Sequence, residues 1–157
     1  SGCANGTIFD DIIEEIKEVK ITSSISISSA EVFKLYKEIN ITPSLYLKSG
    51  AIHGCVLCSK NKTLAFFEDV GRHNAIDKLA GYMFLNNIKP QDKILYTTGR
   101  LTSEMVIKTI MMKIPVLASR SGYTAWGVDL AKESGLTMLG RLRGRTFTVL
   151  SGNHRIK

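Results

Sequence analysis

The sequence predicts a mixed α/β fold, a three-layer αβα sandwich in which helices cover one mixed β-sheet. Three observations lead to this prediction. Short apolar runs typical of strands alternate with helical patterns of about 10–15 residues, the order of elements that parallel crossovers produce. Two of the strand-like runs, at about 51–58 and 63–68, are joined by four residues, which predicts an antiparallel hairpin. The chain has 157 residues, 44% of them hydrophobic, which is enough for one domain with a full core.

The N-terminal region, residues 1–28, is expected to be a lead-in to the main domain at 29–157. It starts with small residues, which predict a flexible loop around Cys3. Thr7 can cap a helix after this loop. Polar residues alternate with isoleucines at 21–27, which indicates a short strand or an extended linker. The helix between them has an apolar stripe at Ile8, Ile12, Ile13 and Ile16.

The main domain opens with a helix whose start is marked by a capping box. In this motif Ser28 and Glu31 each satisfy a backbone N–H group of the first turn. Pro43 ends the helical pattern, because proline cannot continue a helix. The apolar face of this helix is expected to consist of Val32, Leu35, Tyr36 and Ile39.

A strand-to-helix turn at the centre of the chain carries the densest polar chemistry. The strand-like run at 63–67 leads into the segment Glu68–Lys78, from which a helix continues. Its apolar face is expected to include Ile76, Leu79, Ala80, Met83 and Phe84. Free N–H groups at the helix start favour an anion, and the candidate binding residues are Arg72, His73 and Asn74. An ordinary charged turn without a ligand is the alternative.

The second half of the chain continues the alternation of strand and helix. A mostly apolar helix at 105–112 is expected to lie in the core, because few of its faces are polar. Thr124 is a cap for the last helix and Gly135 is its stop. The remaining strands are expected at Lys93–Thr98, Pro115–Ser119, Thr137–Leu142 and Phe147–Leu150.

Charge and composition narrow the possible partners and location. The net charge of +7 favours an anionic partner. Nucleic acid is not favoured, because only 8% of the residues are aromatic and Phe66, Phe67 and Phe84 fall on core-like patterns. No apolar run reaches the roughly 18 residues of a membrane span, and no signal peptide opens the chain. Three cysteines cannot form a disulfide framework, so a reducing, cytoplasmic setting is expected.

Arginines follow four of the predicted strands. Arg72, Arg100 and Arg120 come after the first three, and a basic turn follows the fourth. The carboxyl ends of parallel strands meet at one edge of a sheet, so these turns are expected to gather into a phosphate-binding groove. A solvated basic hairpin is the alternative reading of the last turn. The candidate residues in that turn are Arg141, Leu142, Arg143, Gly144, Arg145 and Thr146.

The order of elements looks like the cytidine-deaminase-like fold, but the zinc ligands of such enzymes are missing. His73 opens one helix without the glutamate that deamination needs two residues later, and Glu104 lies near the start of the next without a cysteine pair. We therefore predict no zinc.

The three cysteines are expected to differ in role. Cys55 and Cys58 lie three apart in a strand and point to opposite faces, so they are expected to be buried, with redox chemistry as the minor alternative. Cys3, in a mobile segment near helix N–H groups, can act as a nucleophile or be incidental.

Several segments together carry a resemblance to a known family. They are His53-Gly54, Glu68–Lys78, Gly99–Val106, Pro115–Ala118 and Gly140–Gly144, with Gly2-Cys3 before them. In this order, over nearly the whole chain, they resemble the C-terminal, deaminase-like domain of the formate dehydrogenase accessory sulfurtransferase (FdhD) family. Many members have a Cys-x-x-Cys loop, whereas Cys3 stands alone in this chain, and the family's N-terminal domain is missing. The resemblance implies that the chain is the C-terminal part of a longer protein.

The resemblance also implies an activity and its partners. Such proteins take persulfide sulfur from a cysteine desulfurase and pass it to the bis-molybdopterin guanine dinucleotide cofactor, which then enters the formate dehydrogenase apoenzyme. Cys3 would be the persulfide carrier, the basic turn would contact the cofactor, and GDP would mimic the cofactor's nucleotide. We expect Glu68 and Asp69 to orient Arg72 or His73, or to accept from guanine. A homodimer is also implied. A cofactor-binding chaperone without sulfur transfer is the alternative.

Overall fold

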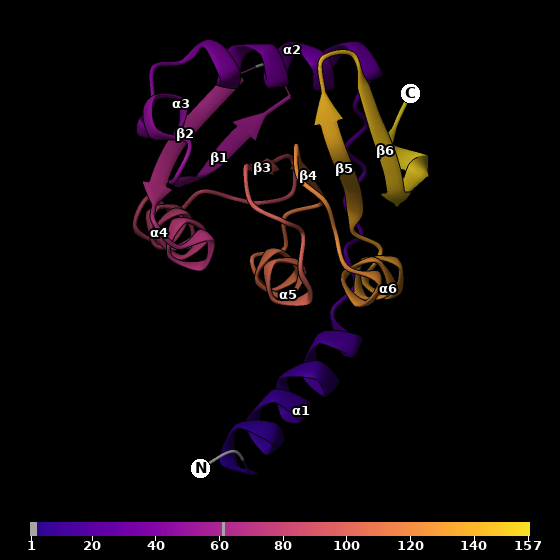
Figure 1. The fold of residues 1–157 in the computed structure, drawn as a ribbon. Coiled ribbons are helices and arrows are strands. Elements are labelled where there is room, and N and C mark those ends of the chain that lie inside the picture. The colour runs from indigo at the N-terminus through magenta and orange to yellow at the C-terminus, as the bar shows by residue number, and fades with distance from the viewer. Residues whose placement is uncertain (1–2, 61) are drawn as a thin grey trace.

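The computed structural model describes the backbone of residues 3–60 and 62–157 and the side chains of residues 11–60 and 62–157. Its main body is a single twisted sheet between two layers of helices, as Figure 1 shows. The predicted mixed α/β class is confirmed. The elements are α1 (Cys3–Glu18), α2 (Ser29–Ile41), α3 (Leu45–Ser49), β1 (His53–Ser59), β2 (Lys62–Asp69), α4 (Arg72–Leu85), β3 (Ile94–Thr97), α5 (Ser103–Met111), β4 (Val116–Ser119), α6 (Ala125–Ser134), β5 (Thr137–Arg143), β6 (Thr146–Ser151) and a short 3₁₀-helix, η1 (Asn153–Arg155).

The sheet has six strands in the order β2-β1-β3-β4-β5-β6. Strands β3, β4 and β5 are parallel, because α5 and α6 return the chain between them. Two antiparallel pairs flank this parallel centre: β1 with β2 on one side and β5 with β6 on the other. The predicted hairpin at 51–68 is therefore confirmed, as is the mixed character of the sheet.

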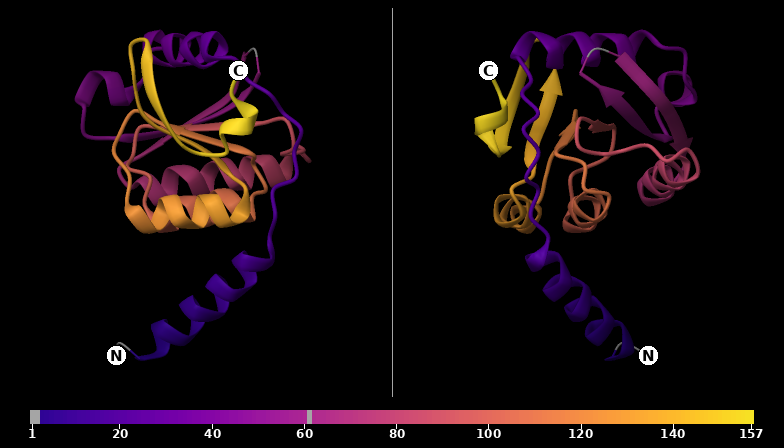
Figure 2. Two further views of the ribbon diagram at one scale, coloured as in Figure 1. Left: turned by 90° about the vertical axis from the view of Figure 1, so that its right-hand side faces the viewer. Right: turned by 180° about the vertical axis from the view of Figure 1, so that it is seen from behind.

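Helix α1 projects away from the body in all three views of Figures 1 and 2. It begins at Cys3, whereas the sequence pattern predicted a loop and a start at Thr7. Its C-terminal half packs on the core through Ile12, Ile13 and the buried Ile16. The linker that follows is extended, and Ile27 forms an isolated bridge with the C-terminal Ile156.

Two caps predicted from the sequence form as expected. Ser28 and Glu31 complete the capping box of α2, with a distance of 2.8 Å from Ser28 N to Glu31 Oε2. Thr124 caps α6, which ends at Gly135 in the left-handed conformation with φ of 74°. No pattern predicted α3, which follows directly on the proline expected to end α2.

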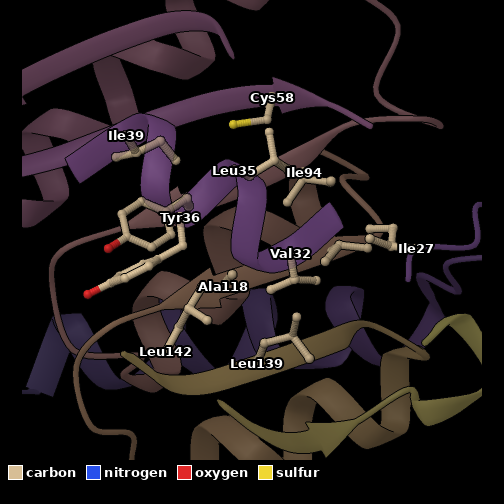
Figure 3. A pocket seen from close by; sticks show the side chains of 12 residues that line it. Ile27, Val32, Leu35, Tyr36, Ile39, Cys58, Ile94, Ala118, Leu139 and Leu142 are labelled. Atoms are coloured by element: carbon tan, nitrogen blue, oxygen red, sulfur yellow. The ribbon is translucent and has the colours of Figure 1, made fainter. Parts of the chain in front are cut away.

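Each face of the sheet has its own core. Helices α4, α5 and α6 cover one face, where the buried side chains include Cys55 and Leu117. Helix α2 covers the other face over a core that contains Cys58. Figure 3 shows Cys58 among the apolar side chains that line a cavity of about 20 Å³ beneath α2. A cavity of that size and polarity is a packing defect rather than a ligand site.

One predicted core residue lies at the surface. Phe84 was placed on the apolar face of α4, but its side chain is 82% exposed. The buried residues of this helix are Ala75, Ile76, Leu79 and Met83. Phe84 lies in the last turn of α4, where exposed Leu85 follows it. In the described part of the chain, none of the helices is both long and apolar enough to cross a bilayer.

Candidate functional site

The strand register brings the predicted arginine turns to one edge of the sheet. Thr97, the last residue of β3, pairs with Ser119 at the end of β4 and with Cys55 near the start of β1. In turn, β1 starts opposite the end of β2, with His53 paired to Asp69. The turns that carry Arg72, Arg100 and Arg120 therefore leave the sheet at the same edge, as the sequence predicted.

Aromatic rings contact two arginines of the predicted turns, Arg120 and Arg141. The guanidinium of Arg120 lies 5.4 Å from the ring centre of Tyr46, and that of Arg141 lies 5.5 Å from the ring centre of Tyr123. Gly140 allows the second contact, because a Cβ atom there would be 2.9 Å from the Tyr123 ring. A bulge in β5 after Gly140 turns the next residue outward, and Arg141 has φ of 53°. Sequence reasoning found the arginines but not the rings beneath them.

The two acids before α4 have structural roles that differ from those expected. The Glu68 carboxylate accepts hydrogen bonds from Leu45 N and Tyr46 N at 3.0 and 2.7 Å, which holds the start of α3. Asp69 pairs with Lys78 at 2.7 Å and accepts from Gly71 N at 2.9 Å. Neither acid orients Arg72 or His73 through a hydrogen bond or ion pair among the described residues.

Asp69 also accepts a hydrogen bond from the Asn74 side chain. The Asn74 Nδ2 group donates to Asp69 Oδ1 at 3.1 Å. The hydrogen bond from Lys78 and those from Gly71 and Asn74 lower the pKa of Asp69 to about 2, so it stays ionised. Of the three residues predicted at the start of α4, Asn74 thus has its side-chain amide engaged, whereas Arg72 remains without an acidic partner among the described residues.

His73, in the first turn of α4, and Glu104, in the first turn of α5, come together. His73 Nε2 lies 3.0 Å from Glu104 Oε2, and one turn further along the same helices Lys108 and Asp77 pair at 2.7 Å. Burial, followed by the charge of Arg72, lowers the pKa of His73 despite the nearby Glu104. At neutral pH the imidazole is therefore neutral, and the contact is not an ion pair. In the described part of the chain, no three His, Cys, Asp or Glu side chains are grouped to hold a metal. That no zinc is bound stays a prediction.

The basic hairpin turn lies away from the α4 start and faces α2. A groove of about 600 Å³ separates the turn from that helix. None of the described residues that line the groove is acidic, and three are cationic: Lys34, Lys37 and Arg145. Phe33 and Tyr36 add aromatic surface. The groove suits a flat, anionic ligand, because guanidinium and ammonium groups attract phosphates while rings stack on a base.

Three of the predicted turn residues differ in their availability. Leu142 is only 2% exposed and belongs to the core beneath α2, so its side chain cannot contact a ligand. Thr146 Oγ1 donates to Arg143 O at 3.1 Å, so its hydroxyl hydrogen already has an acceptor within the turn. The exposed side chain of Arg143 has no such partner among the described residues and can reach an anion. Sequence reasoning missed the contribution of α2, although Lys34 and Lys37 lie opposite its apolar stripe.

The burial predicted for the two strand cysteines is confirmed. Cys55 and Cys58 are fully buried on opposite faces of β1, and burial raises the pKa of each thiol to about 12. Because thiolates are the reactive form, both are inert at neutral pH, and their opposite orientation excludes a disulfide between them. Cys3 opens α1, at the end of the molecule opposite α2 and the hairpin turn in Figure 1, and its side chain lies outside the described part. The structure therefore does not bring Cys3 to the hairpin groove.

Comparison with known proteins gives a consistent result. A sequence profile of the FdhD/NarQ family matches residues 1–157. A protein of Bacillus pumilus named "Sulfur carrier protein FdhD" is 32% identical over 157 residues, covering 99% of this chain and 60% of that protein. A Nocardia farcinica protein of the same name is 41% identical over 116 residues, or 73% of this chain and 42% of that protein.

A solved structure also matches. The crystal structure described as a formate dehydrogenase accessory protein from Desulfotalea psychrophila is 34% identical, with a TM-score of 0.83 over 91% of this chain and 62% of that one. The chain thus spans about 60% or less of the length of these relatives. Since the profile covers every residue and the fold agrees, the chain belongs to the FdhD/NarQ family.

Proposed function

We propose that this chain is a sulfur carrier that serves formate dehydrogenase, with Cys3 as the carrier residue. The observation that carries the proposal is the family match over residues 1–157, together with relatives named as sulfur carrier proteins. The burial of the other two cysteines supports it, because no other described thiol is available for chemistry. The proposed fold type within the α/β class is the cytidine-deaminase-like one.

The proposed activity is that of a sulfurtransferase in the cytoplasm. The Cys3 thiolate attacks the outer sulfur of a persulfide on a cysteine desulfurase. A new S–S bond forms at Cys3 as the old one breaks, and the desulfurase cysteine leaves as a thiolate. The acceptor is the bis-molybdopterin guanine dinucleotide cofactor, which is bound as a substrate before it enters formate dehydrogenase. A homodimer is part of the proposal.

Intact-mass measurement tests the sulfur step. The chain is incubated with a cysteine desulfurase and cysteine, and its mass is measured before and after treatment with a reductant. We expect a gain of one sulfur atom that the reductant removes, and no gain in Cys3→Ala. A cofactor-binding chaperone without sulfur transfer, the second candidate, is favoured by the cationic groove. It predicts cofactor binding with no sulfur gain in either protein.

The Arg143→Ala variant tests cofactor binding at the basic turn beside the groove. A charge-assisted hydrogen bond contributes about 1.5–3 kcal/mol, so loss of this guanidinium is expected to weaken GDP binding by about ten- to a hundredfold. Its salt dependence should weaken too, because one phosphate contact is lost. Calorimetric titration at two salt concentrations measures both effects. Lys89→Ala is the control, because it removes the same charge outside the groove. Equal GDP affinities in wild type and Arg143→Ala would place the nucleotide elsewhere.

A further inference from the structure

Two side-chain nitrogens at the arginine-lined edge of the sheet are buried without hydrogen-bond partners among the described residues. They are Nδ1 of His53, the first residue of β1, and Nε of Arg72, the first residue of α4. Buried polar groups in folded proteins are nearly always paired with protein atoms, water or a ligand. Two unpaired nitrogens in one place therefore offer contacts to a polar ligand.

Gly99 brings the two residues to the same point. A Cβ atom built at Gly99 would lie 3.1 and 3.2 Å from Cβ and Cδ of Arg72 and 3.5 Å from His53 Nδ1. The arginine stem thus rests on the main chain after β3, with the imidazole beside it. This contact fixes where the guanidinium leaves the sheet edge, because any larger residue at position 99 would push the stem away.

No acid forms an ion pair with Arg72 among the described residues. Asp69 is paired with Lys78, and the Glu104 carboxylate lies 3.0 Å from His73 Nε2. Glu68 is engaged at the start of α3. Helix α4 also lacks a side-chain cap, because its N-cap is Gly71. Its first turn therefore combines an unpaired guanidinium with free N–H groups, both of which favour an anion.

His53 responds to the charge at this position. Burial, followed by the charge of Arg72, lowers the pKa of His53, so its ring is neutral at pH 7. The other charged groups around it are Asp69, its register partner on β2, and Arg100, next to Gly99. Asp69 is already neutralised by Lys78. An anion bound at Arg72 would offset the repulsion by Arg72, which is the second cause of the lowered pKa of His53 after burial.

We propose that the first turn of α4 binds a phosphate-type dianion through Arg72, and that His53 takes up a proton from solvent as the anion binds. Protonated His53 donates from both ring nitrogens, which gives the dianion a second positive contact. The proposal deepens the proposed function, because the phosphates of a dinucleotide cofactor are the natural occupants. In this proposal His53 selects dianions, and Gly99 determines the position of Arg72.

The direction of the pH effect follows from this coupling. The pKa of His53 is below 6.5 in the free protein and is expected to be higher in the complex. Between these two pKa values binding takes up a proton, so affinity for the dianion falls as the pH rises through this range. A site without a titrating histidine would show no such dependence beyond the second ionisation of the ligand itself.

NMR titration of the three histidines with inorganic pyrophosphate tests the proton uptake directly. We expect saturation to raise the pKa of His53 by about one unit or more, as a nearby opposite charge does. His154, exposed in η1, provides the reference resonance. His53→Gln identifies the resonance and should remove the pH dependence of affinity, whereas His154→Gln should keep it. An unchanged pKa of His53 at saturation would overturn the proposal.

Glycine variants test the placement of Arg72. Gly99→Ala is expected to weaken pyrophosphate binding by about tenfold through displacement of the arginine stem. Gly81→Ala on α4 is the matched control, because nothing lies within 4 Å of its new methyl group. Equal affinities in the two variants would contradict this assignment. If Arg143→Ala weakened pyrophosphate binding and Gly99→Ala did not, the anion would bind at the hairpin turn. The sulfur loading of Cys3 would not be affected by that result.

Discussion

Replacing Cys3 by alanine is expected to abolish the maturation of formate dehydrogenase. The physical reason is that a sulfur carrier needs an accessible thiolate, and burial excludes the other two cysteines. Both have fully buried side chains and pKa values raised to about 12, which leaves almost no thiolate at pH 7. Formate dehydrogenase activity in cells whose own gene for this protein carries the variant is the measurement.

The matched controls for this prediction are Cys55→Ala and Cys58→Ala. Each removes a thiol from the core, so a modest loss of stability is expected, but the carrier residue remains. Maturation should persist in both when the amount of protein in the cells is equal by immunoblotting. Full maturation in Cys3→Ala, or complete loss in a well-expressed Cys55→Ala, would contradict the assignment.

Replacing Arg155 by methionine is expected to lower the free energy of unfolding by about 1–3 kcal/mol for each buried acceptor that loses its donor. This arginine is 3% exposed and has no carboxylate partner among the described residues. It donates to Ser23 O at 3.1 Å, Ile21 O at 2.9 Å, Gly135 O at 2.7 Å and Thr137 Oγ1 at 3.0 Å. Methionine keeps the length of the stem but leaves four acceptors without this donor, and the hydrogen bonds to Thr137 Oγ1 and Ile21 O are buried. The linker after α1 would lose its main attachment to the domain.

Urea unfolding measures this effect, and two further variants sharpen it. Arg155→Lys keeps the charge but not the planar fork, so an intermediate loss is expected. Arg145→Met changes the same residue type on the exposed hairpin turn and should alter stability by less than about 0.5 kcal/mol. Coincident unfolding midpoints for Arg155→Met and Arg145→Met would show that the buried contacts contribute nothing.

The sequence predicted most of the fold because local signals determine most of its elements. The capping box at Ser28 and the Thr124 and Gly135 ends of α6 depend on residues within one helical turn of each other. The hairpin of β1 and β2 follows from two apolar runs with a short connection. The opposite burial of Cys55 and Cys58 follows from the period of a strand alone.

What the sequence did not predict depends on contacts between distant segments. Helix α3 forms where Glu68, more than 20 residues along the chain, accepts from its first N–H groups. That contact also explains why Glu68 does not orient Arg72. The exposure of Phe84 could not be predicted, because helical periodicity does not tell where neighbouring elements stop covering a helix. Leu142 differs, because its place between Arg141 and Arg143 is a local polar–apolar–polar alternation that indicates an inward-facing strand residue.

The site was predicted in part for the same reason. Arginines after strands are visible in the sequence, and the strand register confirms that Arg72, Arg100 and Arg120 share one edge. The sequence did not show that the hairpin turn faces α2 across a separate groove, since that requires the packing of α2 on the sheet. It also gave no sign that His53 and Arg72 meet at Gly99.

The proposed function depends on the passage of sulfur through Cys3. A pulse–chase experiment tests this passage. The chain is loaded with radioactive sulfur by a cysteine desulfurase, freed of small molecules, and mixed with the molybdenum cofactor and formate dehydrogenase apoenzyme. We expect the label to leave Cys3 and to appear in the cofactor of the enzyme as activity develops. Activity that develops while the label stays on the chain, or equal labelling of the enzyme with Cys3→Ala, would contradict it.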